Sequence, residues 1–354
     1  MDNPLAGDLE FILSNTKDMW EELRGKRIFI TGGTGFFGCW LLESFCWANR
    51  DMGLNAEAWV LTRNPEAFQK RCPHLANDQA VILYKGDVVD FEFPKGSFPL
   101  VIHAATEASA TLNEQYPLRM FDTIVQGTRR TLDFARQAGT KKFLLTSSGA
   151  VYGKQPSEIE YISEDYVGAP DTMNPHWAYG EGKRCAELLC ATYSKHYNIE
   201  SKIARCFAFV GPYLPLDIHF AIGNFIRDGI KGGPIIVNGD GSPYRSYMYA
   251  ADLAVWLWTI LIKGQNCRTY NVGSDNEISI EDLAYKISNK FKPVVKMLIH
   301  AKRISKEPAE RYIPSSARAR NEFNLRESIN LDEAINRTIK WHFGLDKNTR
   351  GYND

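Results

Sequence analysis

The sequence has no surplus of charge of either sign and no long run of like charges. Its 354 residues include 42 basic and 42 acidic side chains, which gives a formal net charge of zero. Binding to nucleic acid or to an anionic membrane through bulk charge needs a basic surplus. The composition therefore predicts neither a nucleic-acid partner nor a membrane partner.

Long apolar runs are also missing. No stretch approaches the roughly 18 uninterrupted apolar residues of a membrane-spanning helix. The first residues, MDNPLAGDLEFIL, are acidic and lack the basic start and apolar stretch of a secretory signal peptide. With 44% hydrophobic and 24% charged residues, the chain has the composition of a soluble globular protein, and we expect it to be cytoplasmic.

Patterns for metal binding and disulfide bonding are absent as well. The seven cysteines are scattered, odd in number and without a C-x-x-C pair, so neither a zinc knuckle nor a disulfide framework is indicated. His103, His176 and His219 are far apart and have no carboxylate partners at ligand spacing. We therefore predict no metal site, and we expect these three histidines to be structural.

What the sequence does have is an alternation of apolar strands with helical patterns. A first strand in KRIFITGG runs into a glycine turn, and later apolar runs are separated by helical segments. Strands that are apolar along their whole length are typical of a parallel sheet covered by helices on both faces. The expected strands lie at 58–62, 81–84, 100–104, 142–147 and 202–208, and the expected helices at 36–50, 116–138 and 179–197. The pattern predicts an α/β fold with a doubly wound parallel Rossmann sheet.

This alternation breaks at about residue 155. Loops rich in proline and glycine follow at 167–175 and 211–217, and shorter elements come after them, including a helix near 251–263. The change predicts a smaller α/β lobe for substrate binding, formed mainly by the C-terminal part. The predicted parts are an N-terminal helical extension at 1–24, a dinucleotide-binding Rossmann domain at 25–210 with returns from about 244–275, and a substrate-binding lobe mainly at 211–354.

The segment TGGTGFFG at 31–38 joins the first strand to a helix. Gly33, Gly35 and Gly38 satisfy G-x-G-x-x-G, and Gly32 extends the pattern to G-x-x-G-x-x-G. Glycines at these spacings let the backbone turn tightly and approach a pyrophosphate, while the helix N-terminus faces the anion. The position on the first strand–turn–helix predicts a dinucleotide site.

The end of the second strand predicts which dinucleotide binds. An acidic residue there would hold the ribose 2′-hydroxyl of NAD, but the sequence reads Leu61-Thr62-Arg63-Asn64. A guanidinium at Arg63 suits a 2′-phosphate, so we expect NADP, with NAD as the alternative. Arg63 could instead be solvated or stack on adenine. Asp87, after the third strand, is expected to contact the adenine amino group or to cap its own loop.

Three hydroxyls end the strand in LTSSGAVYG at 145–153. Ligands of such sheets lie beyond the carboxyl ends of the strands, where Thr146, Ser147 and Ser148 fall. About 30 residues later Tyr179-x-x-x-Lys183 places a phenol and an ammonium on one face of a helix. A lysine beside a nicotinamide cation favours the phenolate and prepares the tyrosine for proton transfer. We predict Ser148, Tyr179 and Lys183 as the catalytic set, with Ser147 and Thr146 satisfying the backbone or contacting ligand.

These motifs resemble an extended short-chain dehydrogenase/reductase of the nucleotide-sugar epimerase/dehydratase type. The resemblance runs from KRIFITGGTGFFG through HAA (103–105), SSGAVYG and YGEGK to RCFAFVGP (205–212), and on through GNFI, GDGSPYRSYMYAADL and YNVGS. Only residues 1–24 lie outside it. The expected cofactor-binding residues are Gly32, Gly33, Gly35, Phe36, Phe37, Gly38, Arg63, Asp87, Val88, Ala104, Ala105, Thr146, Tyr179 and Lys183.

The resemblance also implies a substrate and an assembly. Asn224 and Arg245 would hold the diphosphate of a nucleotide sugar, with Ser147 and Ser148 near the sugar. The alternatives are a helix cap for Asn224 and a salt bridge for Arg245. Arg311 is either a second phosphate contact or a surface residue. In relatives, helices matching 116–138 and 179–197 pair across a two-fold axis, which implies a homodimer; a thicker intramolecular core would give the same pattern.

The sequence departs from its relatives directly after Ser148. Family members that eliminate water carry an Asp-Glu pair there, and the decarboxylases keep the glutamate, whereas this chain has Gly149 and Ala150. Neither can move a proton, so dehydration and decarboxylation by those mechanisms are not expected. Nothing in the sequence places Glu107 or Glu181 as a substitute.

Two further positions differ from the family pattern. Ala208 and Ile124 stand where many relatives carry asparagines near the substrate. They affect the expected substrate pose and leave the catalytic set complete.

The remaining chemistry is hydride transfer at one sugar carbon, most readily C4. An NADPH-dependent 4-keto-sugar reductase is favoured by Arg63, and a nucleotide-sugar 4-epimerase with tightly held NAD is the alternative. A dinucleotide-sensing module without turnover is disfavoured, because Tyr179 and Lys183 are both present.

Overall fold

The computed structural model of the chain describes residues 3–106, 110–218, 220–301 and 308–349. Glu107 and His219, which the sequence analysis considered, lie outside these ranges.

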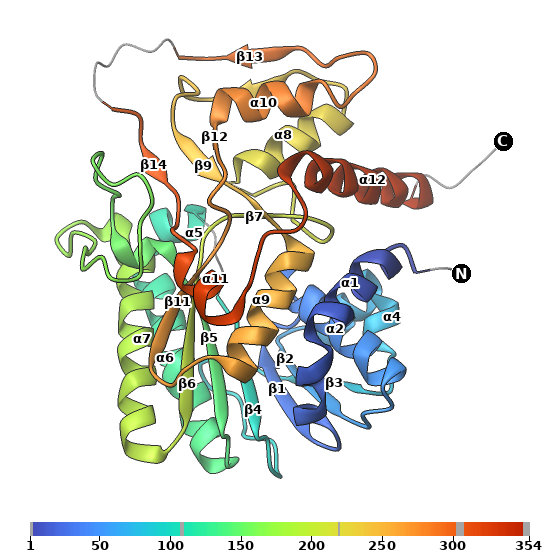
Figure 1. Ribbon diagram of the computed structural model, residues 1–354, viewed down its shortest axis with the longest axis vertical. Coiled ribbons are helices and arrows are strands. Elements are labelled where there is room, and N and C mark those ends of the chain that lie inside the picture. The colour runs from blue at the N-terminus through green and yellow to red at the C-terminus, as the bar shows by residue number, and fades with distance from the viewer. Residues whose placement is uncertain (1–2, 107–109, 219, 302–307, 350–354) are drawn as a thin grey trace.

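A seven-stranded parallel sheet forms the centre of the molecule (Figure 1). Strands β1, β2 and β3 follow one another toward one edge of the sheet. The chain then crosses to the other side of β1 and adds β4, β5, β6 and β11, which gives the order β11-β6-β5-β4-β1-β2-β3. The reversal between β1 and β4 is where such sheets bind ligands. The doubly wound Rossmann sheet is confirmed. Its strands are β1 (Arg27–Thr31), β2 (Glu57–Thr62), β3 (Val81–Lys85), β4 (Leu100–His103), β5 (Lys142–Ser148), β6 (Glu200–Cys206) and β11 (Arg268–Val272).

The apolar strands serve two cores, one on each face of the sheet. Along β1, Ile28 and Ile30 belong to one core and Phe29 to the other, as the two-residue period of a strand requires. Phe29 packs on Phe134, with ring centroids 4.5 Å apart. Helices α2 (Phe36–Asp51) and α9 (Ala250–Lys263) cover the first face, and α6 (Pro117–Gln137) and α7 (Ala178–Tyr197) cover the second. Shorter helices α3 (Pro65–Arg71), α4 (Pro73–Ala76) and α5 (Ala110–Gln115) complete the connections.

The predicted helices match α2, α6, α7 and α9 to within one or two residues. The strand expected at 202–208 is shifted to 200–206, because the chain leaves the sheet after Cys206. It then forms β7 (Phe209–Val210), which pairs in parallel with β10 (Met248–Tyr249).

A smaller α/β lobe lies above the sheet in Figure 1. Its short strands form a three-stranded sheet in the order β12-β9-β14 and a two-stranded sheet of β13 and β8. The lobe's elements are α8 (Ala221–Ile230), β8 (Ile235–Val237), β9 (Tyr244–Ser246), β12 (Glu277–Ser279), α10 (Ile280–Ser288), β13 (Met297–Ile299), β14 (Arg311–Tyr312) and α12 (Leu331–Thr349). Helix α11 (Ala317–Phe323) returns to β11 on the main sheet. Exact domain limits remain a prediction.

The N-terminal residues form α1 (Ala6–Thr16) and a 3₁₀ turn (Lys17–Leu23) that pack on the sheet domain. Leu9 and Ile12 are buried against α9, and Trp20 lies 4.6 Å from Trp258 between ring centroids. The Tyr249 hydroxyl donates to Asp8 (2.6 Å), and Arg337 of α12 forms an ion pair with the same carboxylate. This segment therefore contacts both the sheet domain and the lobe.

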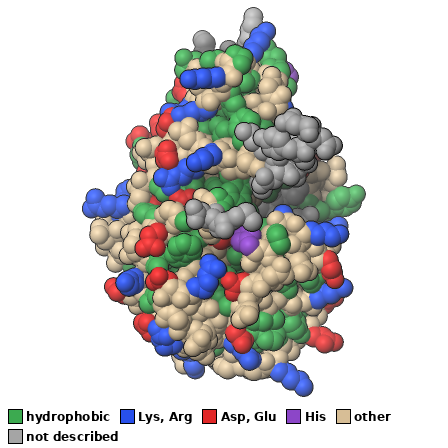
Figure 2. Space-filling view, turned by 90° about the vertical axis from the view of Figure 1, so that its right-hand side faces the viewer, with side chains coloured by type: hydrophobic (Ala, Val, Ile, Leu, Met, Phe, Trp, Pro, Cys, Tyr) green, Lys and Arg blue, Asp and Glu red, His purple; other side chains and the backbone are tan. Residues whose placement is uncertain are grey.

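On the face in Figure 2, Lys and Arg side chains are interspersed with Asp and Glu side chains, as the balanced composition predicts. Within the described ranges, no helix is long and apolar enough to cross a membrane.

Candidate active site

A cavity of about 1740 Å³ lies at the carboxyl ends of the central strands, between the sheet and the lobe. It is lined from one end to the other by residues that follow β1, β2, β3, β4 and β5, and then by residues of the lobe. The predicted catalytic residues Ser148, Tyr179 and Lys183 all line it. A cavity of this volume, lined by residues of both the sheet and the lobe, can hold a dinucleotide and a second ligand together.

The glycine turn forms one wall of the cavity. Gly32 has φ +72°, and a Cβ there would lie 2.5 Å from the backbone carbon of Ala104. Gly35 is the N-cap of α2, so no N-cap side chain covers the first N–H groups of this helix. Gly32, Gly35, Phe36 and Phe37 line the cavity. The turn thus leaves room and backbone donors for a pyrophosphate.

The other two glycines of the motif pack the helix on the sheet. A Cβ at Gly38 would lie 2.3 Å from the backbone of Gly33, and a Cβ at Gly33 would lie 2.7 Å from the Val60 side chain. Neither Gly33 nor Gly38 is among the lining residues. Their place in the motif therefore reflects close helix–strand packing.

Basic side chains lie in the part of the cavity that follows β2. Arg63 follows β2 and lines the cavity, and so does Arg71, whose guanidinium donates to the carbonyl of Thr34. The lining residues between Leu61 and Arg71 include no carboxylate. Asp87 accepts the backbone N–H of Val89 (3.2 Å), so it caps its own loop while lining the cavity beside Val88.

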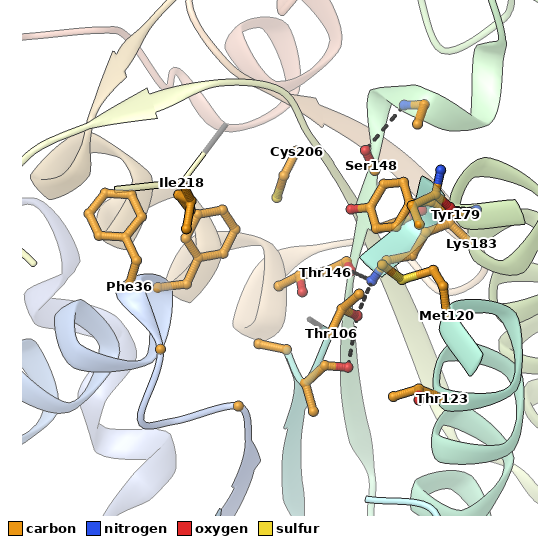
Figure 3. A pocket seen from close by; sticks show the side chains of 18 of the residues that line it. Phe36, Thr106, Met120, Thr123, Thr146, Ser148, Tyr179, Lys183, Cys206 and Ile218 are labelled. Atoms are coloured by element: carbon orange, nitrogen blue, oxygen red, sulfur yellow. Dashed lines mark hydrogen bonds between the residues drawn. The ribbon is translucent and has the colours of Figure 1, made fainter. Parts of the chain in front are cut away.

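The lysine is held by two oxygens at the ends of neighbouring strands. The Lys183 ammonium donates to Thr106 Oγ1 (2.7 Å) and to the carbonyl of Thr146 (2.8 Å) (Figure 3). The side chain is buried, and burial lowers the pKa of Lys183 to about 8. Ala104 and Ala105 line the cavity beside it. Thr146 thus acts on the lysine through its backbone.

The tyrosine and the serine point toward one another (Figure 3). Burial raises the pKa of Tyr179 to about 12, and a hydrogen bond with Ser148 partly opposes this rise. The Lys183 ammonium lies 5.9 Å from the Tyr179 ring centroid. The residues of the chain by themselves therefore keep the phenol protonated. The phenolate expected from the sequence requires a nicotinamide cation in addition to the lysine.

Ser147 faces a different network. Its hydroxyl donates to Glu187 (2.6 Å), and Glu187 also pairs with Arg205 of β6 (2.7 Å). Ser147 thus donates to a side-chain carboxylate rather than to the backbone, and it also lines the cavity.

The residues predicted for the diphosphate are placed differently from one another. Arg245 lines the cavity and pairs with Glu310 (2.6 Å), so the alternative of a salt bridge in the lobe is present. Asn224 is not among the lining residues, and its side-chain oxygen accepts from Arg227 (3.0 Å). Arg311 lines the cavity and pairs with Glu277. The structure thus brings Arg245 to the site and leaves Asn224 outside it.

Three residues that the sequence analysis missed complete the site. Asn113 accepts the backbone N–H of Tyr179 (3.1 Å) and donates to the carbonyl of His176 (2.6 Å), which fixes the start of α7. Thr106 binds the lysine, and Tyr312 lines the cavity from the lobe, with its hydroxyl 2.6 Å from where a Cβ at Gly149 would lie. Only Thr106 had a local signal, since it directly follows the HAA segment.

Ile124 and Ala208, the two positions that differ from the family pattern, lie in different parts of the structure. Ile124 is buried on α6 and packs against Gly182, where a Cβ would lie 3.2 Å from its side chain. Ala208 lines the cavity.

His103 is a structural histidine, as expected. Its two ring nitrogens are 2.7 Å from Thr31 Oγ1 and 3.0 Å from Thr128 Oγ1, inside the sheet. Burial, together with the nearby Lys183 charge, lowers the pKa of His103 to about 3.

Within the described residues, no group of three or more His, Cys, Asp and Glu side chains could hold a metal ion. All seven cysteines are free thiols, and five of them are buried.

The buried His103 should make stability depend on pH. The folded pKa lies below the unfolded value near 6.5, so the unfolded state binds the proton first and stability falls as pH drops from 6.5 toward 3. Between pH 6.5 and 5 this group should cost about 2 kcal/mol. The free energy of unfolding, measured by urea titration at each pH across this range, should depend less steeply on pH in the His103→Gln variant than in the wild-type protein. The exposed His196, replaced in the same way, is the control, and an unchanged slope for His103→Gln would contradict the assignment.

The fold and the site define a class of protein, and sequence comparison agrees. A family model described as "NAD dependent epimerase/dehydratase family" matches residues 28–273. The chain belongs to this family.

Individual relatives carry several activities. UDP-glucuronic acid decarboxylase 1 of Arabidopsis thaliana is 29% identical over 319 residues, which cover 88% of this chain and 69% of that protein. The UDP-glucose 4-epimerase of Thermotoga maritima, solved with UDP-glucose, superposes with a TM-score of 0.75 at 19% identity, over 90% of this chain and 99% of that one. A dTDP-glucose 4,6-dehydratase of Bacillus anthracis, solved with NAD, gives a TM-score of 0.72 at 18% identity, over 91% and 98%. At these identities the solved structures support the fold.

Proposed function

We propose that the chain transfers hydride at C4 of a nucleotide-diphosphate sugar and acts as an NADPH-dependent 4-keto-sugar reductase. The observation that carries this proposal is a complete Ser148–Tyr179–Lys183 set followed by Gly149 and Ala150, which cannot move protons. When bound, the nicotinamide supplies the hydride. The residues of the chain then have to hold the sugar oxygen and deliver one proton to it.

The protonation state of Tyr179 supports the direction of reduction. A reductase needs a proton donor at the carbonyl oxygen, and burial keeps this phenol protonated at neutral pH. Ser148 lies beside the phenol and can hold the same oxygen by a hydrogen bond. Lys183, fixed by Thr106 and Thr146, stabilises the phenolate that remains after proton transfer.

The absence of a carboxylate next to Ser148 argues against the activity of the decarboxylase relatives. Ala150 lines the cavity where the sequence analysis expected those enzymes to keep a glutamate. Among the residues that the structure describes, the carboxylates that line the cavity are Asp87, Asp122 and Glu310, and none of them follows Ser148 in the sequence. Asp87 caps its own loop and Glu310 is paired with Arg245.

A 4-epimerase with tightly held NAD is the second candidate. It needs Tyr179 to remove a proton as well as to donate one. Because burial keeps this phenol protonated, the Lys183 ammonium, 5.9 Å from the centroid of the phenol ring, would have to act together with a nicotinamide cation to favour the phenolate that such a step requires.

One experiment separates the two candidates. The purified protein is mixed with NADPH and a panel of 4-keto-6-deoxy nucleotide sugars, and nicotinamide absorbance is followed. Oxidation of NADPH by one of them is the expected result. Inversion at C4 of an ordinary nucleotide sugar without added cofactor, with no NADPH oxidation in the panel, would establish the epimerase instead.

The choice of NADP over NAD rests on Arg63. Replacing Arg63 with aspartate should raise the KM for NADPH at least about tenfold and lower the KM for NADH, because a charged hydrogen bond to the 2′-phosphate is lost and a partner for the 2′-hydroxyl is gained. Steady-state kinetics with both cofactors measure this. Lys70→Ala removes a nearby exposed cation that does not line the cavity, and it should change neither KM. An Arg63→Asp variant with unaltered preference would show that Arg63 does not contact the 2′-phosphate.

We also propose a homodimer formed through α6 and α7. Leu118 on α6 is 79% exposed and Leu188 on α7 is 68% exposed, so each of these two adjacent helices presents an apolar side chain that a second copy could cover. Sedimentation of the purified chain at micromolar concentration tests this, and a monomer would refute it.

A further inference from the structure

The segment that follows β4 brings the Thr106 hydroxyl to the cavity on a fixed backbone. The N–H of Ala104 donates to the carbonyl of Thr31 (3.1 Å), and the N–H of Ala105 donates to Thr31 Oγ1 (3.2 Å). The Thr106 hydroxyl donates its own proton to the carbonyl of Ala105 (2.7 Å). A threonine hydroxyl has one proton and two lone pairs, so toward any further partner Thr106 can only accept a hydrogen bond.

That further partner is the ammonium of Lys183. It donates to Thr106 Oγ1 (2.7 Å) and to the carbonyl of Thr146 (2.8 Å), which follow or end neighbouring strands (Figure 3). An ammonium has three protons. These two hydrogen bonds therefore leave one proton for a ligand in the cavity that Lys183 lines. Both acceptors are neutral oxygens, so neither cancels the charge of the lysine.

The carboxylate best placed in sequence to pair with Lys183 is engaged elsewhere. Glu187 lies four residues further along α7, where oppositely charged side chains commonly pair. One of its oxygens accepts from Ser147 (2.6 Å) and from Arg205 Nε (3.0 Å), and the other accepts from Arg205 Nη2 (2.7 Å). The charge of Glu187 is thus balanced by Arg205, and Lys183 is held by neutral acceptors.

Among the described residues, the remaining titratable groups around Lys183 do not change charge near neutral pH. Burial raises the pKa of the Tyr179 phenol and of the Cys206 thiol to about 12, and it also raises the pKa of the Cys190 thiol. His103 stays neutral because burial lowers its pKa to about 3. Burial lowers the pKa of Lys183 to about 8. Lys183 is therefore the member of this group that loses its charge just above neutral pH.

We propose that Thr106 is a positioning residue, which keeps the Lys183 ammonium charged, leaves its third proton free for the bound ligand and so sets the alkaline limit of activity. A neutral acceptor stabilises the charged form of a buried ammonium. Without Thr106, the lysine keeps a single acceptor and loses its proton at lower pH. The inference rests on the proposed function for the reaction in which the charge is used, since Lys183 stabilises the phenolate that Tyr179 leaves.

The first test needs no substrate. In the protein labelled with ¹³C at the lysine Cε, the resonance of Lys183 is assigned by its absence in Lys183→Arg, and its shift is followed with pH. The wild-type inflection should fall at about 8. Thr106→Val should lower it by about one pH unit, because a hydrogen bond to a charged group is lost. Thr106→Ser keeps the hydroxyl and should titrate as the wild type does.

An unshifted inflection in Thr106→Val would overturn the proposal. Thr106→Ala removes the same oxygen with less bulk and takes the place of the valine variant if that variant does not fold. Thr192→Val is the matched control. It removes an exposed hydroxyl that donates to the carbonyl of Leu188 (2.8 Å) on the same helix, outside the cavity, and it should leave the inflection unchanged.

The second test is kinetic, on the nucleotide sugar that the panel identifies. The wild-type kcat/KM should fall above about pH 8, and in Thr106→Val the fall should begin about one pH unit lower. At about pH 6 the lysine is charged in both proteins, and their kcat values should differ less than about threefold. A loss of kcat that is equal at every pH would indicate a purely structural role, and a loss confined to the KM of the sugar would indicate direct contact with it. Either result would overturn the proposal.

The two tests also separate this inference from the proposed function. A shifted Lys183 inflection with no sugar converted in the panel would sink the reductase and leave the contact with Thr106 established. Conversion of a sugar by a Thr106→Val chain with an unshifted inflection and an unshifted alkaline limit would support the reductase and refute the role of Thr106.

Discussion

Replacing Tyr179 with phenylalanine is expected to reduce kcat by about 10³-fold, the largest effect of any conservative change in the site. The variant keeps the ring and the α7 helix and loses only the group that delivers the proton. Because Asn113 holds the backbone of Tyr179 rather than its hydroxyl, the start of α7 should stay in place. The affinity for the dinucleotide, measured by fluorescence titration, should therefore change little.

A control on the same helix separates chemistry from folding. Tyr197 is 45% exposed near the end of α7, and Tyr197→Phe should retain full activity. If Tyr179→Phe also kept full kcat, hydride transfer by this set would be excluded. If the variant lost dinucleotide affinity together with activity, Tyr179 would have a structural role that the geometry does not indicate.

Replacing Gly38 with valine is expected to remove dinucleotide binding and to destabilise the protein by about 3 kcal/mol or more. A Cβ at this position would lie 2.3 Å from the backbone of Gly33, and backbone cannot rotate away as a side chain can. Helix α2 would have to move off β1. Its N-terminus, which faces the cavity, would move with it.

The alanine variant keeps this prediction testable if the valine variant does not fold. Gly38→Ala should lower Tm by about 5 °C or more and weaken dinucleotide binding in the same titration. Gly7→Ala is the control, since a Cβ there meets no atom within 4 Å and alanine favours the α1 helix. Its Tm should be unchanged or slightly higher. A Gly38→Ala chain with wild-type Tm would show that α2 can shift without cost.

The central sheet could be predicted because each of its strands has a strong local signal. Strands such as β1 and β4 each contain three consecutive apolar residues, and long helices lie between the strands, so their type and parallel arrangement follow from the sequence pattern. The lobe could be predicted only as a region. Its strands β9 and β14 have three and two residues, too few to show a period of two, and they exist because the rest of the fold brings them together.

The same difference between local sequence signals and tertiary contacts applies to the residues of the site. Ser148, Tyr179 and Lys183 stand in short motifs whose spacing carries their chemistry, and the structure places all three in the cavity. Asn113 and Tyr312 act through tertiary contacts, and nothing in their local sequence marks them. Asn224 was assigned from the resemblance, and α8 directs its amide oxygen to Arg227 instead. Local motifs thus predict the groups that we propose to react, while the groups that hold them depend on long-range packing.

The packing of α1 shows that the N-terminal residues belong to the same folded unit as the sheet. Helix α9 is buried almost along its full length, and its outer side is covered by α1 and Trp20 rather than by water. Residues 6–23 therefore form a third layer over the sheet, and we expect them to melt together with it. A boundary drawn at Gly25, where the family resemblance begins, would cut through a hydrophobic core. It would also break the Asp8 contacts through which the first helix ties α12 to the sheet domain.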